Sequence, residues 1–126
     1  MRVITHDIIC TYLTILVSDS HNNDKHYLVS KWLNTIYQML QAVTPDTKLI
    51  FICSPGNPTA KSVPLSDVRL IASSVNAIVI VDEAYVDFSS VPSATSLVTD
   101  FDNVVVLQTL SKAFGMAGIR CGFAIG

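Results

Sequence analysis

The chain has 126 residues, a length that suits one modest domain with a buried core. Half of its residues are hydrophobic and only 14% are charged, whereas roughly a quarter are charged in a typical soluble domain. This balance is typical of the buried centre of an α/β protein. The net charge of −2 and the lack of a Lys/Arg cluster give no basic field, so neither nucleic acid nor an anionic membrane surface is expected as a partner.

The three cysteines, Cys10, Cys53 and Cys121, are odd in number and far apart in the sequence. Two of them lie in apolar runs. This pattern indicates neither a disulfide framework nor a zinc site, and we therefore expect no metal. Free thiols are typical of a reducing compartment, and the expected location is cytoplasmic.

The N-terminal segment contains the apolar run from Ile8 to Val17, which is too short to cross a bilayer. A signal peptide is disfavoured, because the run is preceded by only one basic residue, Arg2, and is followed by no small-residue cleavage site. The β-branched residues of the run favour one or two strands. The polar stretch from Ser18 to Lys25 is predicted to be a loop or a boundary.

From about Tyr27 to Val43, apolar residues recur at three- and four-residue spacing, which predicts an amphipathic helix. Asp24 or Lys25 would lie near its start, and Thr44-Pro45 would end it. We interpret the apolar stripe as part of the core rather than as the wall of a cofactor site. Its members are Leu28, Trp32, Leu33, Ile36, Tyr37, Leu40 and Val43.

Short apolar runs further along the chain predict buried strands. After the first of them, Ser66 is a suitable N-cap for a helix of about ten residues that runs toward Val75. Strands that alternate with helices predict an α/β fold, in the form of an α/β/α sandwich with a mostly parallel sheet. The predicted strands are Lys48–Cys53, Ala77–Val81, Val104–Leu107 and Cys121–Ile125.

Polar motifs directly follow three of these runs. S-P-G-N-P-T begins at Ser54, D-E-A-Y begins at Asp82, and T-L-S-K begins at Thr109. Ligands of open α/β sheets bind just beyond the carboxyl ends of the strands, so this coincidence predicts a binding site. Taken singly, each residue also has an ordinary structural interpretation: Asn57 as a turn former, Asp82 as a helix cap and Tyr85 as a core residue.

Lys112 lies in a turn of small hydroxyl residues at the end of an apolar strand, which suggests a partly desolvated amine of the kind that forms Schiff bases. Arg120 would add a fixed cation suited to a phosphate. The alternative is a solvated lysine at a strand end and a surface arginine. Asp82 directly follows I-V-I-V, so its carboxylate would start buried and would need a cation or a hydrogen-bond donor.

A nucleotide site is the competing interpretation, because I-V-I-V-D-E resembles a Walker B strand. The segment from Gly56 to Ser62 imitates a P-loop but is one residue short and lacks the second glycine. Pro58 also removes a backbone N–H from any phosphate cradle. The motifs therefore disfavour nucleotide binding.

Together and in this order, the three motifs resemble those of the fold-type-I pyridoxal-phosphate (PLP) aminotransferases. D-E-A-Y-V-D-F and T-L-S-K-A-F-G-M-A-G-I-R-C-G-F are most similar to the histidinol-phosphate aminotransferases, and the resemblance runs from about Trp32 to Gly126. It implies PLP as the cofactor and a homodimer for full-length members. It also implies amino transfer from L-histidinol phosphate to 2-oxoglutarate in histidine biosynthesis, which yields imidazole-acetol phosphate and glutamate.

The resemblance implies a role for each motif residue. Lys112 would be the catalytic residue that binds the cofactor covalently and moves the substrate proton. Asp82 would pair with the ring nitrogen of the cofactor, and Asn57 and Tyr85 would bind its phenolic oxygen. The residues expected to hold the cofactor phosphate are Thr109, Ser111 and Arg120.

The sequence also departs from the family pattern. Residues 1–30 do not match it, and neither a small C-terminal domain nor the glycine-rich phosphate turn is found. Ala60 stands where the family has glycine, which is costly if its φ is positive. We therefore expect residues 31–126 to be a partial PLP-binding large domain with impaired transamination. The alternative hypothesis is a non-catalytic remnant that binds PLP weakly or only associates with another chain.

Overall fold

The computed structural model describes residues 14–19, 25–28 and 32–126. In these ranges the strands form one six-stranded sheet in the order β2-β1-β3-β4-β5-β6. Their bounds are β1 (Thr14–Asp19), β2 (Lys25–Leu28), β3 (Thr47–Cys53), β4 (Ile78–Asp82), β5 (Val104–Thr109) and β6 (Gly122–Ile125).

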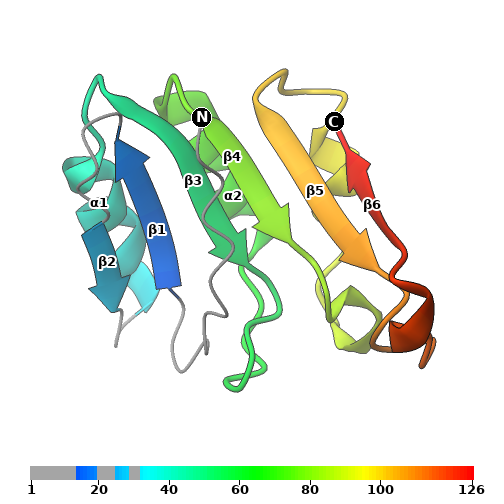
Figure 1. The fold of residues 1–126 in the computed structure, drawn as a ribbon. Coiled ribbons are helices and arrows are strands. Elements are labelled where there is room, and N and C mark those ends of the chain that lie inside the picture. The colour runs from blue at the N-terminus through cyan, green and yellow to red at the C-terminus, as the bar shows by residue number, and fades with distance from the viewer. Residues whose placement is uncertain (1–13, 20–24, 29–31) are drawn as a thin grey trace.

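The centre of the sheet is parallel and its borders are antiparallel. β3, β4 and β5 run in one direction, with Cys53 opposite Asp82 and Asp82 opposite Leu107. β1 is antiparallel to both β2 and β3, and β6 is antiparallel to β5. The carboxyl ends of the three parallel strands therefore meet at one edge of the sheet, the lower edge in Figure 1.

The helices α1 (Trp32–Ala42) and α2 (Leu65–Ser74) both lie behind the sheet in Figure 1. Shorter 3-10 turns follow as η1 (Val86–Phe88), η2 (Ala94–Leu97) and η3 (Ala117–Ile119). The apolar sides of α1 and α2 pack with inward side chains of the parallel strands, and this contact forms the core. Its most deeply buried residues are Met39, Ile50, Ile52, Val68, Ile71, Val79, Val81, Leu97, Val104 and Val106.

The opposite face of the sheet is more open. Side chains alternate along a strand, which places Phe51, Ile80 and Leu107 on this face, where each is only half-buried. Ile78, also on this face, is 45% exposed. Asp82 lies two residues beyond Ile80 on the same side of β4, so this apolar face leads directly to the polar strand end.

The side chain of Asn103 binds backbone carbonyl groups at the edge of the sheet where the parallel strands begin. Its Nδ2 lies 3.1 Å from the carbonyl oxygens of Ala72 and Ala77 and 3.4 Å from that of Val75. The backbone carbonyl oxygen of Asn103 accepts a hydrogen bond from the Val79 N–H at 2.8 Å. Asn103, which lies just before β5, thus joins the end of α2 to the start of β4 through its side chain and its backbone.

The predicted α/β class is confirmed, and so are the four later strands, with small shifts at their ends. The predicted start of the first helix, near Tyr27, is wrong. Tyr27 lies in β2 opposite Ile15, and pairing with β1 keeps this segment extended until the helix begins at Trp32. The polar stretch predicted as a loop is also shorter, because its first two residues lie in β1 and Lys25 opens β2.

Two further expectations concern the N-terminal segment. The last four residues of its apolar run lie in β1, as expected of a strand, and residues 8–13 lie outside the described part of the chain. Residues 20–24 of the predicted loop are also outside it.

The predicted cap of α2 is wrong as well. The helix begins at Leu65, its N-cap is Pro64, and no side chain caps it. The proline ring fixes an extended backbone just before the helix, with φ −57° and ψ 142°, and the Pro64 carbonyl accepts the N–H groups of Asp67 and Val68. The hydroxyl of Ser66 instead donates to the Asp67 carboxylate at 3.4 Å.

We expect Ile50→Ala to lower the free energy of unfolding by about 2–5 kcal/mol, because it deletes methylene groups and leaves a cavity in the core. Ile50, in β3, is 0% exposed and belongs to the core cluster that includes residues of α1 and α2. Ile78→Ala is the matched control: it removes the same atoms from a side chain that is 45% exposed. Urea unfolding followed by circular dichroism measures both, and equal losses would contradict this account of the core.

Candidate functional site

The three polar motifs start side by side at the lower edge of the sheet. The Ser54 N–H donates to the Asp82 carbonyl at 2.9 Å, and the Glu83 N–H donates to the Leu107 carbonyl at 2.8 Å. These bonds continue the parallel ladders one step beyond the regular strands. The loop after β3, the turn after β4 and the turn after β5 are therefore held in register at their origins.

The loop after β3 has a closed base and an exposed tip. The Val63 N–H donates to the Ser54 hydroxyl at 2.8 Å, and the Gly56 N–H donates to the Lys61 carbonyl at 2.9 Å. Ser54 and Gly56 are buried, whereas Asn57 is exposed. This base presents the Asn57 amide toward the neighbouring turn.

The Asn57 amide meets the second and third motifs at Tyr85. Its Nδ2 donates to the Tyr85 hydroxyl at 2.9 Å. The Lys112 Nζ lies over the same tyrosine ring, 5.2 Å from its centroid, a distance suited to a cation–π contact. Three segments that are far apart in the sequence thus place an amide, a phenol and an amine together.

Asp82 is half-buried at the end of β4. Its Oδ1 accepts a hydrogen bond from the Ala84 N–H at 3.1 Å, so the donor expected from the sequence comes from its own turn. Among the described residues, no hydrogen bond reaches its other oxygen, Oδ2. The carboxylate therefore keeps one acceptor for a ligand.

The turn after β5 brings two hydroxyl groups together. The Ser111 N–H donates to the Thr109 Oγ1 at 3.1 Å, and the two side-chain oxygens are 3.0 Å apart. The Leu110 N–H donates to the Cys121 carbonyl at 3.2 Å, which returns the chain to β5. A Cβ at Gly122 would lie 2.8 Å from the Gln108 carbonyl oxygen, so this close return requires glycine.

Arg120 precedes that return and has a left-handed backbone with φ 53°. Its side chain is exposed and makes no hydrogen bond or ion pair to another described residue. Arg120 is therefore available for a ligand, but the structure does not bring its guanidinium into contact with the two hydroxyl groups.

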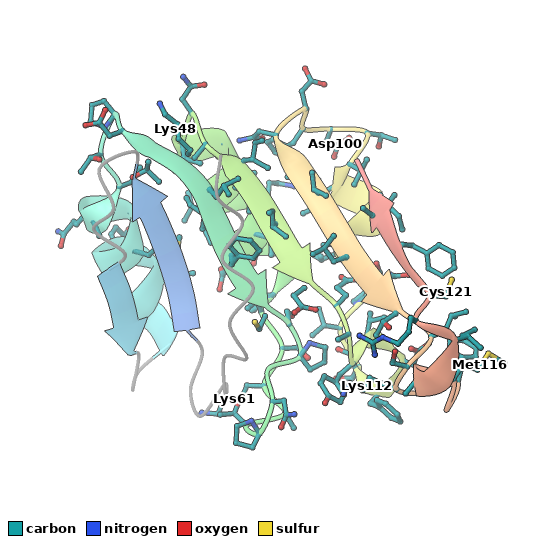
Figure 2. The ribbon with its side chains drawn as sticks, in the orientation of Figure 1. Lys48, Lys61, Asp100, Lys112, Met116 and Cys121 are labelled. Carbon is teal, nitrogen blue, oxygen red and sulfur yellow. The ribbon has the colours of Figure 1, made fainter. Side chains whose placement is uncertain are left out.

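Lys112 is exposed, and the expected partial desolvation of its amine is wrong for the described part of the chain. The residues from 112 to 120, which include η3, are all exposed, so no described element covers this segment. Figure 2 shows Lys112 at the edge where β4 and β5 end, while Lys48 lies at the opposite edge and Lys61 in the loop after β3. The amine is positioned by its neighbours without being buried by them.

Sequence reasoning missed Glu83, which is only 3% exposed. Its carboxylate binds side chains and backbone from two later segments of the chain, described below. The available signal was its place directly after Asp82, which by alternation turns its side chain toward the core face.

Membrane-spanning helices and groups of metal ligands are both absent from the described residues. No helix there is long and apolar enough to cross a membrane. No group of three or more His, Cys, Asp or Glu side chains in those residues could hold a metal ion.

The model of the class I and II aminotransferases matches residues 6–126, and the chain therefore belongs to this family. The match begins at residue 6, within the segment 1–30 for which the sequence motifs predict no resemblance to the family. It includes all the motifs at the lower edge of the sheet.

Individual relatives agree with the family assignment. The curated histidinol-phosphate aminotransferase of Francisella philomiragia is 48% identical over 92 residues, which is 71% of this chain and 26% of that protein. A PLP-dependent aminotransferase of Streptococcus suis is 32% identical with a TM-score of 0.60, and the match covers 72% of this chain and 25% of that one. An aminotransferase of Mycobacterium tuberculosis is 26% identical with a TM-score of 0.62, covering 79% and 28%. The chain thus spans about a quarter of the length of these relatives.

We expect Ala60→Gly to raise the free energy of unfolding by about 1 kcal/mol, because Ala60 has φ 54°, a left-handed conformation that glycine adopts without a Cβ clash. Ala117→Gly is the matched control: Ala117 opens η3, where glycine only adds disorder to the unfolded chain and should cost about 0.5–1 kcal/mol. Chemical denaturation measures both changes. A loss of stability with Ala60→Gly would show that the turn tolerates its alanine.

Proposed function

We propose that this chain carries the cofactor-binding centre of a PLP-dependent aminotransferase, with Lys112 as the residue that binds the cofactor covalently. The observation that carries the proposal is that Lys112 and Asn57 both contact Tyr85. The Lys112 Nζ lies 5.2 Å from the centroid of the tyrosine ring, and the Asn57 Nδ2 donates to the tyrosine hydroxyl at 2.9 Å. An amine next to a phenol that already accepts an amide N–H suits a ligand with both an aldehyde and an adjacent phenolic oxygen.

The remaining side chains at this edge fit the other parts of PLP. The unengaged Oδ2 of Asp82 suits the protonated nitrogen of a pyridine ring, since a half-buried carboxylate gains from a cation. The paired hydroxyl groups of Thr109 and Ser111 are donors suited to a phosphate, and the exposed guanidinium of Arg120 supplies charge. The chemistry of the donor set therefore fits the cofactor at each of its polar positions.

When bound, PLP would supply an electron sink for the carbon that carries the substrate's amino group. The Asp82 carboxylate holds the proton on the ring nitrogen and so maintains that sink. The Tyr85 hydroxyl, itself held by Asn57, orients the phenolic oxygen. The Lys112 Nζ, which lies over the tyrosine ring, would take the proton from the substrate's Cα and deliver it to the cofactor carbon that carried the aldehyde.

We propose L-histidinol phosphate as the amino donor and 2-oxoglutarate as the acceptor, in histidine biosynthesis. Support comes from curated relatives named histidinol-phosphate aminotransferase, which are 48% and 50% identical over 92 and 86 residues. The products are then imidazole-acetol phosphate and glutamate. A homodimer is proposed for the full-length form, and the division into a segment 1–30 and a partial large domain 31–126 stays a prediction.

A second proposal is a non-catalytic chain that binds PLP weakly or associates with another chain. The observation that favours it is the exposure of the large apolar side chains around Lys112, with Phe114 56% and Ile119 61% exposed. Such a surface is more typical of an interface than of a finished enzyme site. Both proposals share the cofactor site and differ in whether substrate chemistry follows binding.

We expect borohydride treatment of the chain with PLP to leave the cofactor attached to Lys112, because this amine lies at the strand ends with its proposed ligands. Peptide mapping by mass spectrometry identifies the modified lysine. Lys112→Ala should abolish the adduct, and Lys61→Ala, which removes an exposed lysine from the same edge, should leave it unchanged. Labelling of Lys48 or Lys61 in place of Lys112 would overturn the assignment.

We expect Asp82→Asn to retain PLP binding but to slow exchange of the Cα proton of glutamate with solvent deuterium by at least about tenfold, equivalent to about 1.4 kcal/mol of barrier. The amide can still accept the Ala84 N–H, but it lacks the charge that holds the ring proton. Asp87→Asn neutralises an exposed acid in η1 and serves as control. Unchanged exchange in Asp82→Asn, measured by NMR, would show that the carboxylate does not pair with the ring.

Absence of any exchange in the unmodified chain, together with a normal adduct at Lys112, would select the non-catalytic proposal instead. The two measurements therefore separate binding from catalysis.

A further inference from the structure

Glu83 is a buried acid on the reverse side of the candidate site. It is 3% exposed and directly follows Asp82. Successive side chains of an extended segment point to opposite faces, so Asp82 lies on the open face of the sheet and Glu83 lies on the core face. Gln108 and Thr109 divide in the same way at the end of β5, with Gln108 on the side of Glu83.

The Glu83 carboxylate accepts hydrogen bonds from two later segments. Its Oε1 accepts the backbone N–H of Ala94 at 2.6 Å. Its Oε2 accepts the Ser93 hydroxyl at 2.6 Å and the Gln108 side-chain Nε2 at 2.9 Å. We call Glu83, Ser93, Ala94 and Gln108 the Glu83 cluster.

The cluster has donors but no cation. A buried carboxylate is strongly destabilising unless hydrogen bonds replace its lost hydration, and here three donors do so. A carboxylate only accepts hydrogen bonds, so the Ser93 hydroxyl, the Ala94 N–H and the Gln108 amide must each direct a hydrogen toward it. No buried side-chain polar atom of the described residues lacks a partner, so the cluster is fully satisfied.

The cluster connects the two strand ends that carry the candidate site. Glu83 shares a backbone bond with β5, because its N–H donates to the Leu107 carbonyl at 2.8 Å, and its side chain holds the next residue, Gln108. Asp82 directly precedes Glu83, and Thr109 directly follows Gln108. The hydrogen bonds of Glu83 on the core face of the sheet thus fix the distance between Asp82 and the turn that begins at Thr109.

Ser93 adds a third anchor. Its hydroxyl oxygen accepts the Thr95 N–H at 3.1 Å and so caps η2, whose Ala94 and Leu97 are buried in the core. The cluster therefore ties the strand ends to a packed element rather than to each other alone.

We propose that Glu83 is a positioning residue: its carboxylate locks the ends of β4 and β5 to η2 and so sets the spacing between Asp82 and the Thr109–Lys112 turn. The part of this inference that concerns PLP rests on the proposed function. The part that concerns the strand ends does not.

Glu83→Ala and Glu83→Gln separate this role from simple core filling. Alanine leaves the Ala94 N–H without an acceptor. Glutamine can keep its carbonyl toward Ala94 and place its amide toward Gln108, whose side chain can turn to present its own carbonyl. Glutamine should therefore rescue most of the effect. Asp102→Ala, which removes an exposed acid, is the control.

The first measurement needs no cofactor: amide hydrogen exchange followed by NMR. In Glu83→Ala, exchange should be at least about tenfold faster at Ala94, and also at Ala84 and Ser111, whose N–H groups bind Asp82 and Thr109. Acceleration confined to Ala94 would overturn the proposal, because it would show that the site does not respond to the cluster.

The second measurement is the PLP concentration that half-saturates the borohydride-trapped adduct at Lys112, expressed per folded molecule. It should rise about fivefold or more in Glu83→Ala and in Gln108→Ala, and the double variant should be no worse than either, since both remove one connection. An unchanged value per folded molecule would reduce Glu83 to a structural role and overturn the proposal.

Failure of the proposed function looks different. If the unmodified chain forms no adduct at Lys112, that function fails, and the exchange rates at Ala84 and Ser111 still decide the role of Glu83. If Glu83→Ala does not fold, Gln108→Ala gives both readouts, and normal values in that variant would overturn the inference.

Discussion

Backbone hydrogen bonds between the parallel strands β3, β4 and β5 bring three loops to one edge of the sheet. The ladders continue past the regular strands at Ser54 and Glu83, so the loops leave the sheet already aligned. Every candidate site residue except Arg120 depends on this alignment, because each lies within a few positions of the end of β3, β4 or β5. The Asn57 to Tyr85 bond joins residues that only this pairing could place together. The chemistry of the edge is therefore a consequence of sheet register.

Much of this arrangement could be predicted from the sequence, because buried parallel strands have continuous apolar runs whose ends are marked by abrupt polar motifs. The expected meeting of Asn57, Tyr85 and Lys112 follows from that logic. The cost expected at Ala60 is also explained locally, since the turn imposes a positive φ. The positions of the strand ends and of the first residues after them can thus be predicted from the local sequence pattern alone.

Other features depend on partners that lie far away in the chain. The predicted start of α1 is wrong because β1 pairs with Tyr27 and its neighbours, and that pairing overrides a helical pattern. The position of Glu83 after Asp82 predicts that its side chain faces the core, but not its role, which requires donors at Ser93, Ala94 and Gln108. The exposure of Lys112 could not be predicted either, since burial depends on what packs over a turn and not on its residues.

Side-chain hydrogen bonds also join elements at the opposite edge of the sheet, where the parallel strands begin, and the groups involved differ from those at the candidate site. Asn103 binds the end of α2 and the residue just before β4 through one neutral amide, with no ionisable group among its partners. The Asn103 contacts and the candidate site consequently lie at opposite ends of the same strands. Loops at the end with the candidate site can therefore diversify during evolution without weakening the contacts at the other end, which is how one scaffold can host many substrate specificities.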